Sequence, residues 1–559
     1  MIFHVDCYPL VLIMAIRLTT AIATFVLVLL LYRVGRIGRR PKGLPPGPPT
    51  LPLIGNLHLM PREKGHLQFQ KWAEEYGPIY SLILGTQIMI VLSSDQVVKD
   101  LLDKRSGIYS SRPDKYLGND IASGGFRMLL MQYGETWRMV RGIVHHSLNI
   151  NASRAYVPYQ DLESRAMLVG MLERPGRFFD HLRRFTNSLS TQIVFGFRTP
   201  NLDDPKLKQL FHGLAEWSKL TGSQSAAILD VFPILRSLPD MLLPSRKHAR
   251  ELHRKEYNLF VGHYLTAKKK LKEGTAQPCF CSDLVRAQDQ LKFSDGLAGY
   301  TSGSLLEAGS DTTAATLIGF VQALVIFPEV SVLAQAEIDR VCGERMPNLN
   351  DLPNLPYIRG CMKESLRWMP TTILGVPHAA TRDDEYMGYR IPKGSGVLLN
   401  VWSIHNDPRR YPDPRRFDPN RWIQDNQSSA EALSNSDINK RDHFVFGAGR
   451  RLCQGMHIAD RNLFLGISRL LWAFNFEKAA DETTGEKVTP NMEDLTEGLL
   501  VCPKPFRADI KPRSPHKAES IRKEWGKMTI LLDDEMQWKT VPEGLVWQDY
   551  EPWEATEKQ

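Results

Sequence analysis

One cysteine of this chain lies in a short loop whose neighbours favour a reactive thiolate. Residues 446–455 read Phe-Gly-Ala-Gly-Arg-Arg-Leu-Cys-Gln-Gly, which places the sulfur at Cys453. Gly447 and Gly449 permit positive φ and let backbone approach a flat ligand closely, and Arg451 offers a planar charge to a carboxylate. A helical pattern follows, and a helix N-terminus stabilises a thiolate. A cysteine beside glycines is by itself more often a small core residue, so the loop needs support from other motifs.

A second pattern lies in the middle of the longest expected helix. Residues 308–313 read Ala-Gly-Ser-Asp-Thr-Thr, and a glycine with adjacent threonines weakens a helix interior. A threonine hydroxyl can bond back to a carbonyl and open the helix locally, which leaves room for a small ligand and water. Asp311 and Thr312 can then relay protons. Taken alone, the segment would equally suit a capped helix break.

Two further pairs have helical spacing. Glu364 and Arg367 are three residues apart, and Trp137 and Arg141 are four apart, so each pair shares one helical face. In isolation, the first pair would be a solvated ion pair of little energetic value. The second would be an interfacial tryptophan beside a surface arginine.

Taken together and in this order, the motifs resemble those of the cytochrome P450 superfamily. The resemblance covers approximately residues 44–513. Its haem-binding loop is matched at every characteristic position, namely Phe446, Gly447, Gly449, Arg451, Cys453 and Gly455. The resemblance implies that Cys453 is the axial ligand of the haem iron, and that Phe446, Gly447, Arg451 and Gly455 form the cofactor loop around it. A zinc site is disfavoured because no second ligand pair has usable spacing.

The same resemblance implies roles for the other motifs. Asp311 and Thr312 would deliver protons to bound dioxygen as the catalytic pair. Trp137, Arg141 and His378 would contact the haem propionates, which suits arginine–carboxylate pairing. Glu364, Arg367 and Arg421 would form a buried charge triad beneath the haem with a structural role. In the segment Phe-Asp-Pro-Asn-Arg-Trp at 417–422, Asn420 stands where the family often has glutamate.

These motifs require a large, mainly helical body. We expect helices at 67–76 and about 295–327, a hairpin of strands 79–84 and 87–92, and strands at 389–391 and 396–399. The predicted fold class is therefore mainly α (α+β), a helical haem-binding fold with a small, partly N-terminal sheet.

The chain divides into five predicted segments: 1–9 lumenal, 10–32 a transmembrane anchor, 33–50 a basic and proline-rich linker, 51–514 the haem-thiolate domain, and 515–559 a separate tail of unknown role. Basic residues follow the apolar stretch, which places the body in the cytosol. The alternative is a cleaved signal peptide, but its basic region would precede the apolar core. We expect a single-pass protein of the endoplasmic reticulum membrane.

Charge and composition limit the partners. The 70 basic and 62 acidic residues give a net charge of +8, without the arginine-rich runs or zinc-finger spacing of nucleic-acid binding. The implied cofactor is haem b (iron protoporphyrin). No flavin or nicotinamide motif is found, so the resemblance implies a separate NADPH-dependent flavoprotein reductase, with Arg138 and Arg450 as candidate contacts.

The expected reaction inserts one atom of dioxygen into a lipophilic small molecule. Segments 116–130 and 371–376 are mostly apolar and should line the substrate pocket. The chain resembles fungal enzymes of secondary-metabolite biosynthesis. Three alternatives stay open: a catabolic hydroxylase of aromatic compounds, a haem-thiolate isomerase or dehydratase that needs no external electrons, and a haem-binding protein without catalysis.

Overall fold

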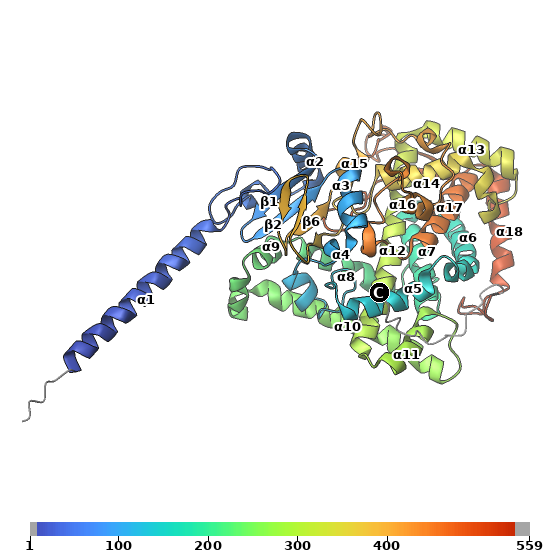
Figure 1. The fold of residues 1–559 in the computed structure, drawn as a ribbon. Coiled ribbons are helices and arrows are strands. Elements are labelled where there is room, and N and C mark those ends of the chain that lie inside the picture. Colours follow the sequence, from blue (N-terminus) through green and yellow to red (C-terminus); the bar gives the residue numbers. More distant parts are fainter. Residues whose placement is uncertain (1–7, 543–559) are drawn as a thin grey trace, which may run out of the picture.

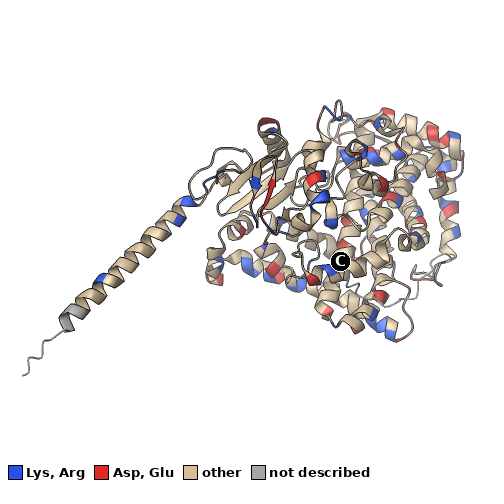
Figure 2. Ribbon diagram, viewed as in Figure 1, with Lys and Arg blue, Asp and Glu red and all other residues tan. Residues whose placement is uncertain are grey.

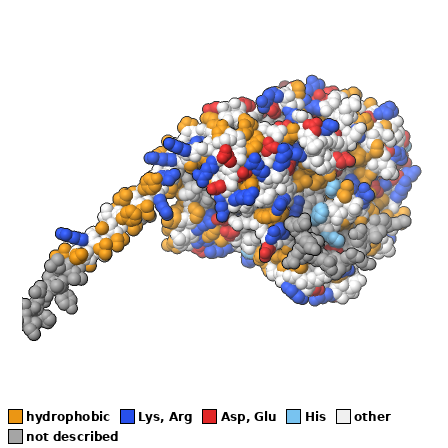
Figure 3. Space-filling view, viewed as in Figure 1, with side chains coloured by type: hydrophobic (Ala, Val, Ile, Leu, Met, Phe, Trp, Pro, Cys, Tyr) orange, Lys and Arg blue, Asp and Glu red, His pale blue; other side chains and the backbone are white. Residues whose placement is uncertain are grey.

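The computed structural model describes residues 8–542, except for the side chains of 8–11 and 30. Helix α1 (Tyr8–Arg36) projects from the body like a stalk (Figure 1). Its stretch Leu12–Arg36 is long and apolar enough to cross a membrane, and hydrophobic side chains follow its length (Figure 3). Basic residues occur at the end of α1 that adjoins the body (Figure 2). The predicted anchor 10–32 lies within α1, whereas most of the segment 1–9 lies outside the described residues.

A small four-stranded sheet lies near the base of this stalk (Figure 1). Strands β1 (Ile79–Leu84) and β2 (Gln87–Leu92) form the predicted hairpin, which turns at Gly85 with φ of +55°. Strand β6 (Gly396–Leu399) pairs parallel to β2 and antiparallel to β3 (His378–Ala379). The other strands form two separate pairs: β4 (Asp384–Tyr386) with β5 (Tyr389–Ile391), and β7 (Phe474–Lys478) with β8 (Ala508–Pro512).

Helix α12 (Asp295–Ile326) is the central element of the helical body. It begins where Ser294 Oγ accepts a hydrogen bond from the Leu297 amide, and it stops before Pro328. Although α12 is apolar enough to span a membrane, 78% of its most apolar window is buried inside the body. It crosses α7 (Phe178–Phe195) closely at Gly309, where a Cβ atom would lie 2.4 Å from Ser190 Oγ. This close contact requires glycine at position 309 and brings α12 and α7 together.

The remaining helices surround α12 (Figure 1). They are α2 (Gly65–Tyr76), α3 (Asp95–Val98), α4 (Ser106–Tyr109), α5 (Glu135–Leu148), α6 (Val157–Glu173), α8 (Pro205–Thr221), α9 (Gln224–Val231), α10 (Pro244–Lys272), α11 (Phe280–Leu291), α13 (Pro328–Cys342), α14 (Pro356–Trp368), α15 (Val401–His405), α16 (Ser429–Ser434), α17 (Met456–Ala473) and α18 (Pro515–Thr529). The mainly helical fold class is thus confirmed.

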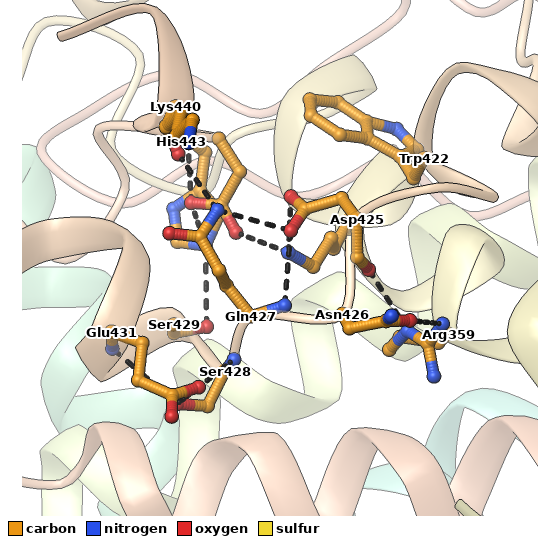
Figure 4. A network of polar contacts seen from close by, with 12 residues as sticks. Arg359, Trp422, Asp425, Asn426, Gln427, Ser428, Ser429, Glu431, Lys440 and His443 are labelled. Atoms are coloured by element: carbon orange, nitrogen blue, oxygen red, sulfur yellow. Dashed lines mark hydrogen bonds and ion pairs between the residues drawn. The ribbon is translucent and has the colours of Figure 1, made fainter. Parts of the chain in front are cut away.

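A polar network ties the loop before the cysteine segment to α14 (Figure 4). Lys363 on α14 pairs with Asp425 at 2.6 Å and with Asp442 at 3.1 Å. Arg359 donates from Nε to the Asp425 carbonyl at 3.0 Å and from Nη2 to Asn426. Because these groups are mostly withdrawn from water, the loop is held in one position beneath the cavity described below.

The C-terminal extension is attached to the body over its described part, 515–542. Helix α18 packs against α6, with Ile521 1% exposed. Beyond it, Trp538 Nε1 donates to Gln192 Oε1 at 2.7 Å. The described part of the predicted C-terminal extension therefore packs on the body, with α18 against α6 and Trp538 against α7. Trp547 and Trp553 of this extension lie outside the described residues.

Candidate active site

The cysteine loop is shaped by its two left-handed glycines. Gly447 and Gly449 have φ of +77° and +60°, as predicted. A Cβ atom at Gly449 would lie 2.0 Å from the Leu102 carbonyl oxygen, so glycine is required there. The Cys453 amide donates to the Phe446 carbonyl at 2.9 Å and closes the loop. The closed loop directs the side chain of Cys453 into a large cavity.

The Cys453 sulfur lies inside the protein yet is accessible from this cavity. Burial raises the pKa of the thiol, while the Gly455 backbone N–H and the positive charge of Arg141 lower it. Gly455 also precedes α17, whose N-terminus favours a negative sulfur. A cation bound at the sulfur would therefore complete a partly prepared thiolate site.

Helix α12 forms the opposite wall of the cavity. The lining residues of this helix include Ala308, Gly309, Thr312, Thr313 and Thr316. The Thr312 hydroxyl donates to the Ala308 carbonyl at 2.7 Å, which is the expected back-bond. The local opening of the helix is not seen, because α12 continues without interruption through this segment.

The two predicted catalytic residues occupy different positions. Thr312 lines the cavity, whereas Asp311 lies behind the wall and is not among the lining residues. Burial raises the pKa of Asp311, and the nearby Arg183 opposes this shift. Asp311 can thus hold a proton close to Thr312 without contacting a ligand directly.

Three arginines converge at one edge of the cavity: Arg112, Arg141 and Arg451, called the arginine cluster below. Arg112 donates to the Val376 and Pro377 carbonyls at 2.7 and 2.8 Å. Arg451 donates to the Ser110 and Met131 carbonyls at 2.8 and 2.7 Å. No carboxylate within residues 8–542 forms an ion pair with any of the three, so their charge is unbalanced.

This unbalanced charge is visible in the pKa values. Burial, reinforced by the neighbouring arginines, lowers the pKa of Arg112. Burial lowers the pKa of Arg141 to about 10. Burial and the positive charge of Arg141 together lower the pKa of Arg451 to about 9. A dianionic edge, such as two propionates, would reverse these shifts and relieve the repulsion. The cluster therefore fits the carboxylate edge of a haem.

His378 and Trp137 complete this edge. His378 Nδ1 donates to the Tyr109 carbonyl at 2.7 Å, so the neutral ring offers only a lone pair at Nε2. Burial lowers its pKa to about 3. A carboxylate nearby would favour the protonated ring, which could then donate from Nε2. Trp137 stacks beneath Arg451, with the guanidinium carbon 4.1 Å from the ring centre.

The predicted triad is brought together under the cysteine loop. Arg367 donates from Nη2 and Nε to the two Glu364 oxygens at 2.6 and 2.8 Å, and both side chains of this pair are inaccessible to water. Arg421 Nε lies 3.4 Å from Glu364 Oε1. Trp422, which the sequence analysis did not assign, donates to Glu364 Oε2 at 2.9 Å. Unlike the arginine cluster, the triad contains a carboxylate that pairs with both of its arginines inside the protein.

The cavity has a volume of about 360 Å³ and a mostly apolar lining. From the two segments expected to line it, Met128, Leu129, Thr371, Thr372, Gly375 and Val376 do so. Leu117 and Leu130 instead pack into a separate apolar cluster with α8 and α9. A flat, largely apolar ligand fits between α12 and the cysteine loop.

The family model for cytochrome P450 matches residues 45–509. The chain belongs to the cytochrome P450 family. Cytochrome P450 monooxygenase virE of Hypocrea virens is 62% identical over 94% of this chain and 96% of its own length. Cytochrome P450 monooxygenase fogE of Aspergillus ruber is 54% identical, over 96% and 99% respectively. A zebrafish cytochrome P450 structure with progesterone has a TM-score of 0.65 at 24% identity and covers 80% of this chain and 99% of its own, which shows the shared fold.

The predictions of family, fold class and enzyme class are thereby confirmed: this cytochrome P450 is a haem-thiolate monooxygenase. Arg112 was not predicted as a site residue, because the sequence Ser-Ser-Arg-Pro around it matches no cofactor-binding motif. Glu307, which pairs with Arg127 in the cavity wall, was likewise assigned no role.

Proposed function

We propose that this cytochrome P450 hydroxylates a lipophilic small molecule in fungal secondary-metabolite biosynthesis. It would be anchored by α1 in the endoplasmic reticulum membrane, carry haem b, and receive electrons from an NADPH-dependent flavoprotein reductase. The single observation that carries the proposal is that Cys453 and Thr312 line one mostly apolar cavity. The fungal origin of the monooxygenases to which it is similar supports the choice of pathway type.

Cys453 would bind the haem iron through its sulfur, and the arginine cluster with Trp137 and His378 would hold the two propionates. The thiolate-bound haem supplies oxidation by dioxygen when it is present. The protein determines which substrate carbon is presented and keeps bulk water away through the apolar lining. Glu364, Arg367 and Arg421 would hold the loop that carries the sulfur.

Thr312 and Asp311 would manage protons on the side opposite Cys453. The Thr312 hydroxyl lines the cavity and can donate to a ligand if it releases the Ala308 carbonyl. Asp311 lies behind it and tends to keep its proton, because burial raises its pKa. Arg183 on α7 opposes this shift electrostatically, so the carboxyl can also release its proton.

The electron-transfer partner would meet the face beneath the cysteine loop. Arg138 and Arg450 are exposed, and both guanidinium groups lie near the ring of Tyr133. Charge reversal at both positions should slow reduction by the flavoprotein and weaken its salt dependence. Unchanged rates at all salt concentrations would remove these two residues from the docking face.

The decisive experiment is the carbon monoxide difference spectrum of the dithionite-reduced protein. We expect the red-shifted band of thiolate-ligated iron, together with NADPH-dependent and reductase-dependent oxidation of an apolar substrate. A histidine-type spectrum would overturn the assignment of Cys453. Turnover without reductase or dioxygen would instead favour an isomerase or dehydratase. Deletion of the gene followed by comparison of metabolites would identify the pathway.

A further inference from the structure

A second charged cluster lies at another part of the cavity wall and is not explained by haem binding. Arg127, in the segment before α5, contacts Glu256 of α10 and Glu307 of α12. All three side chains are at least nine-tenths buried, with exposures of 3%, 4% and 8%. Arg127 and Glu307 line the cavity, whereas Glu256 lines, together with Glu307, a smaller hollow between α8 and α10. These three residues are called the glutamate cluster below.

The contacts in this cluster leave one carboxyl oxygen free to bind a ligand. Arg127 Nη2 donates to both Glu256 oxygens at 2.7 Å, and Nε donates to Ser123 Oγ at 3.0 Å. Arg127 Nη1 donates to Glu307 Oε2. Within residues 8–542, Glu307 Oε1 receives no hydrogen bond. The Arg127 guanidinium also stacks on Trp217 at 4.1 Å, so it cannot readily turn to another partner.

Ser304 adds an independent sign of an absent partner. It lies one turn before Glu307 on α12, which puts both side chains on one helical face. Ser304 Oγ is buried, lines the same cavity, and has no hydrogen-bond partner within the described residues. Buried hydroxyls almost always have a partner, so an unpaired one in a ligand cavity points to a polar group of the ligand.

The charge of the cluster selects the kind of ligand. One guanidinium faces two carboxyl groups, so a further anion would be repelled. Burial raises the pKa of Glu307 to about 8, with Arg127 opposing and Glu256 adding to the shift. A protonated Glu307 leaves the cluster neutral and presents a group that can donate or accept a hydrogen bond.

We propose that Glu307 and Ser304 bind a neutral hydroxyl or carbonyl group of an otherwise apolar substrate. This inference rests on the proposed function and names its substrate class. Glu307 precedes Thr312 by five residues, which is about 7.5 Å along the helix axis. The polar group would thus be held several bonds away from the carbon that faces Thr312. Aliphatic lining residues such as Leu189, Ile193 and Leu305 would cover the apolar remainder.

The test uses the haem-loaded full chain and four probes of equal chain length: octane, octan-1-ol, octan-2-one and octanoate. Affinity is measured by calorimetry and by the change in the haem absorption spectrum. In Glu307→Leu, we expect the ratio of octan-1-ol to octane affinity to fall about tenfold, because the hydroxyl loses its buried partner. Octane affinity should stay within about twofold, and octanoate should bind the native protein more weakly than octan-1-ol.

Two variants serve as matched controls. Glu307→Gln keeps the shape and a neutral hydrogen-bonding group, so it should retain most of the octan-1-ol preference. Thr316→Val removes a hydroxyl of the same cavity that already donates to the Thr312 carbonyl at 3.1 Å, so the affinity ratio should not change. If Glu307→Leu failed to fold, Ser304→Ala would carry the test with a smaller loss of the ratio.

The outcomes separate this inference from the proposed function. A thiolate-type carbon monoxide spectrum with an unchanged affinity ratio in Glu307→Leu and Ser304→Ala would overturn the inference alone. Tighter binding of octyltrimethylammonium than of octan-1-ol would also overturn it, because the cluster would then select a cation. Absence of the thiolate spectrum in the native protein would overturn the proposed function itself.

Discussion

The arginine cluster and the glutamate cluster line the same cavity but have opposite charge imbalances. Arg112, Arg141 and Arg451 bring three positive charges together without a carboxylate partner among residues 8–542. Arg127, in contrast, faces two carboxyl groups. The triad of Glu364, Arg367 and Arg421 differs from both, because one carboxylate with several donors is satisfied within the protein.

The comparison teaches where a ligand is needed. Burying a charge is costly unless it is paired, so an imbalance in a cavity indicates that a ligand completes the pairing. The arginine cluster demands an anion and suits the propionates. The glutamate cluster can neutralise itself by retaining a proton, and so it suits an uncharged polar group. The two clusters of one cavity thus have different net charges, one suited to the cofactor and the other to the substrate.

Cys453→Ala should have the largest effect, because without the sulfur the arginine cluster alone must hold the cofactor. We expect complete loss of the thiolate-type carbon monoxide band and of substrate oxidation. Spectroscopy of the purified variant checks this. Cys342→Ala, a buried cysteine remote from the cavity lining, should leave the band intact. Normal oxidation by Cys453→Ala would contradict the assignment.

Asp311→Asn tests the buried carboxyl next to Thr312. Without an ionisable group behind Thr312, proton delivery should slow, and product formation should fall about 100-fold. NADPH oxidation should continue, with its electrons recovered as hydrogen peroxide. Measuring product, peroxide and NADPH together distinguishes this uncoupling from misfolding. Asp509→Asn, at a partly exposed carboxylate that pairs with Lys511, should behave like the native protein. Equal coupling in both variants would exclude a role for Asp311.

Arg112→Leu should weaken cofactor retention without abolishing it, because Arg141 and Arg451 remain. A charge-assisted hydrogen bond is worth about 1.5–3 kcal/mol, so haem should leave roughly 10- to 100-fold faster. Transfer of haem to an excess of apomyoglobin measures this rate. The rate of haem loss from Arg112→Lys should lie between those of the native protein and Arg112→Leu. Lysine keeps the positive charge but lacks the planar, forked donor group of arginine. An unchanged rate in Arg112→Leu would show that the cluster does not bind the propionates.

The pH dependence of ketone binding should show the smallest effect and sharpen the view of the glutamate cluster. Glu307 is faced by Arg127, by Glu256 of α10, and by Tyr300 and Asp311 of its own helix. Its raised pKa keeps the proton below about pH 8, so it can donate to a carbonyl there. The octan-2-one preference over octane should therefore fall about fivefold as pH rises through this value.

Octan-1-ol should keep its preference over the same pH range, because its hydroxyl can donate to the ionised carboxylate. Glu307→Gln should remove the pH dependence of ketone binding altogether. Calorimetric measurement of both affinities between about pH 6.5 and 9.5 checks these expectations. This range extends roughly 1.5 pH units on either side of the transition. A ketone preference that rises with pH would contradict protonation of Glu307.

Local features of the fold could be predicted well. The hairpin of β1 and β2, the long helix α12 and the glycines of the cysteine loop depend on residues close together in the chain. Their periodicity and turn residues are visible without tertiary information. The short strand β3 could not be found this way, because two residues carry no recognisable pattern and only pairing with β6 defines them.

The candidate site could be predicted only where its residues occur in motifs. Arg112 was missed because its role depends on the approach of carbonyls from 376 and 377, far along the chain. Glu307 received no role, because its partner Arg127 lies 180 residues away and no spacing rule connects them. Trp538, which attaches the C-terminal extension to the body, contacts a residue 346 positions away. This contact could not be predicted from the sequence either.

That attachment has a practical consequence for shortened forms of the enzyme. Arg198 uses Nη1 to hold the Met536 carbonyl and Nε to hold Glu163, which is itself inaccessible to water. Cutting the chain after residue 514 would open this ionic core to solvent and remove the cover over α6. Variants for expression or crystallisation that lack α1 leave these contacts intact. Truncations or affinity tags at the C-terminal end should leave the residues up to Trp538 in place.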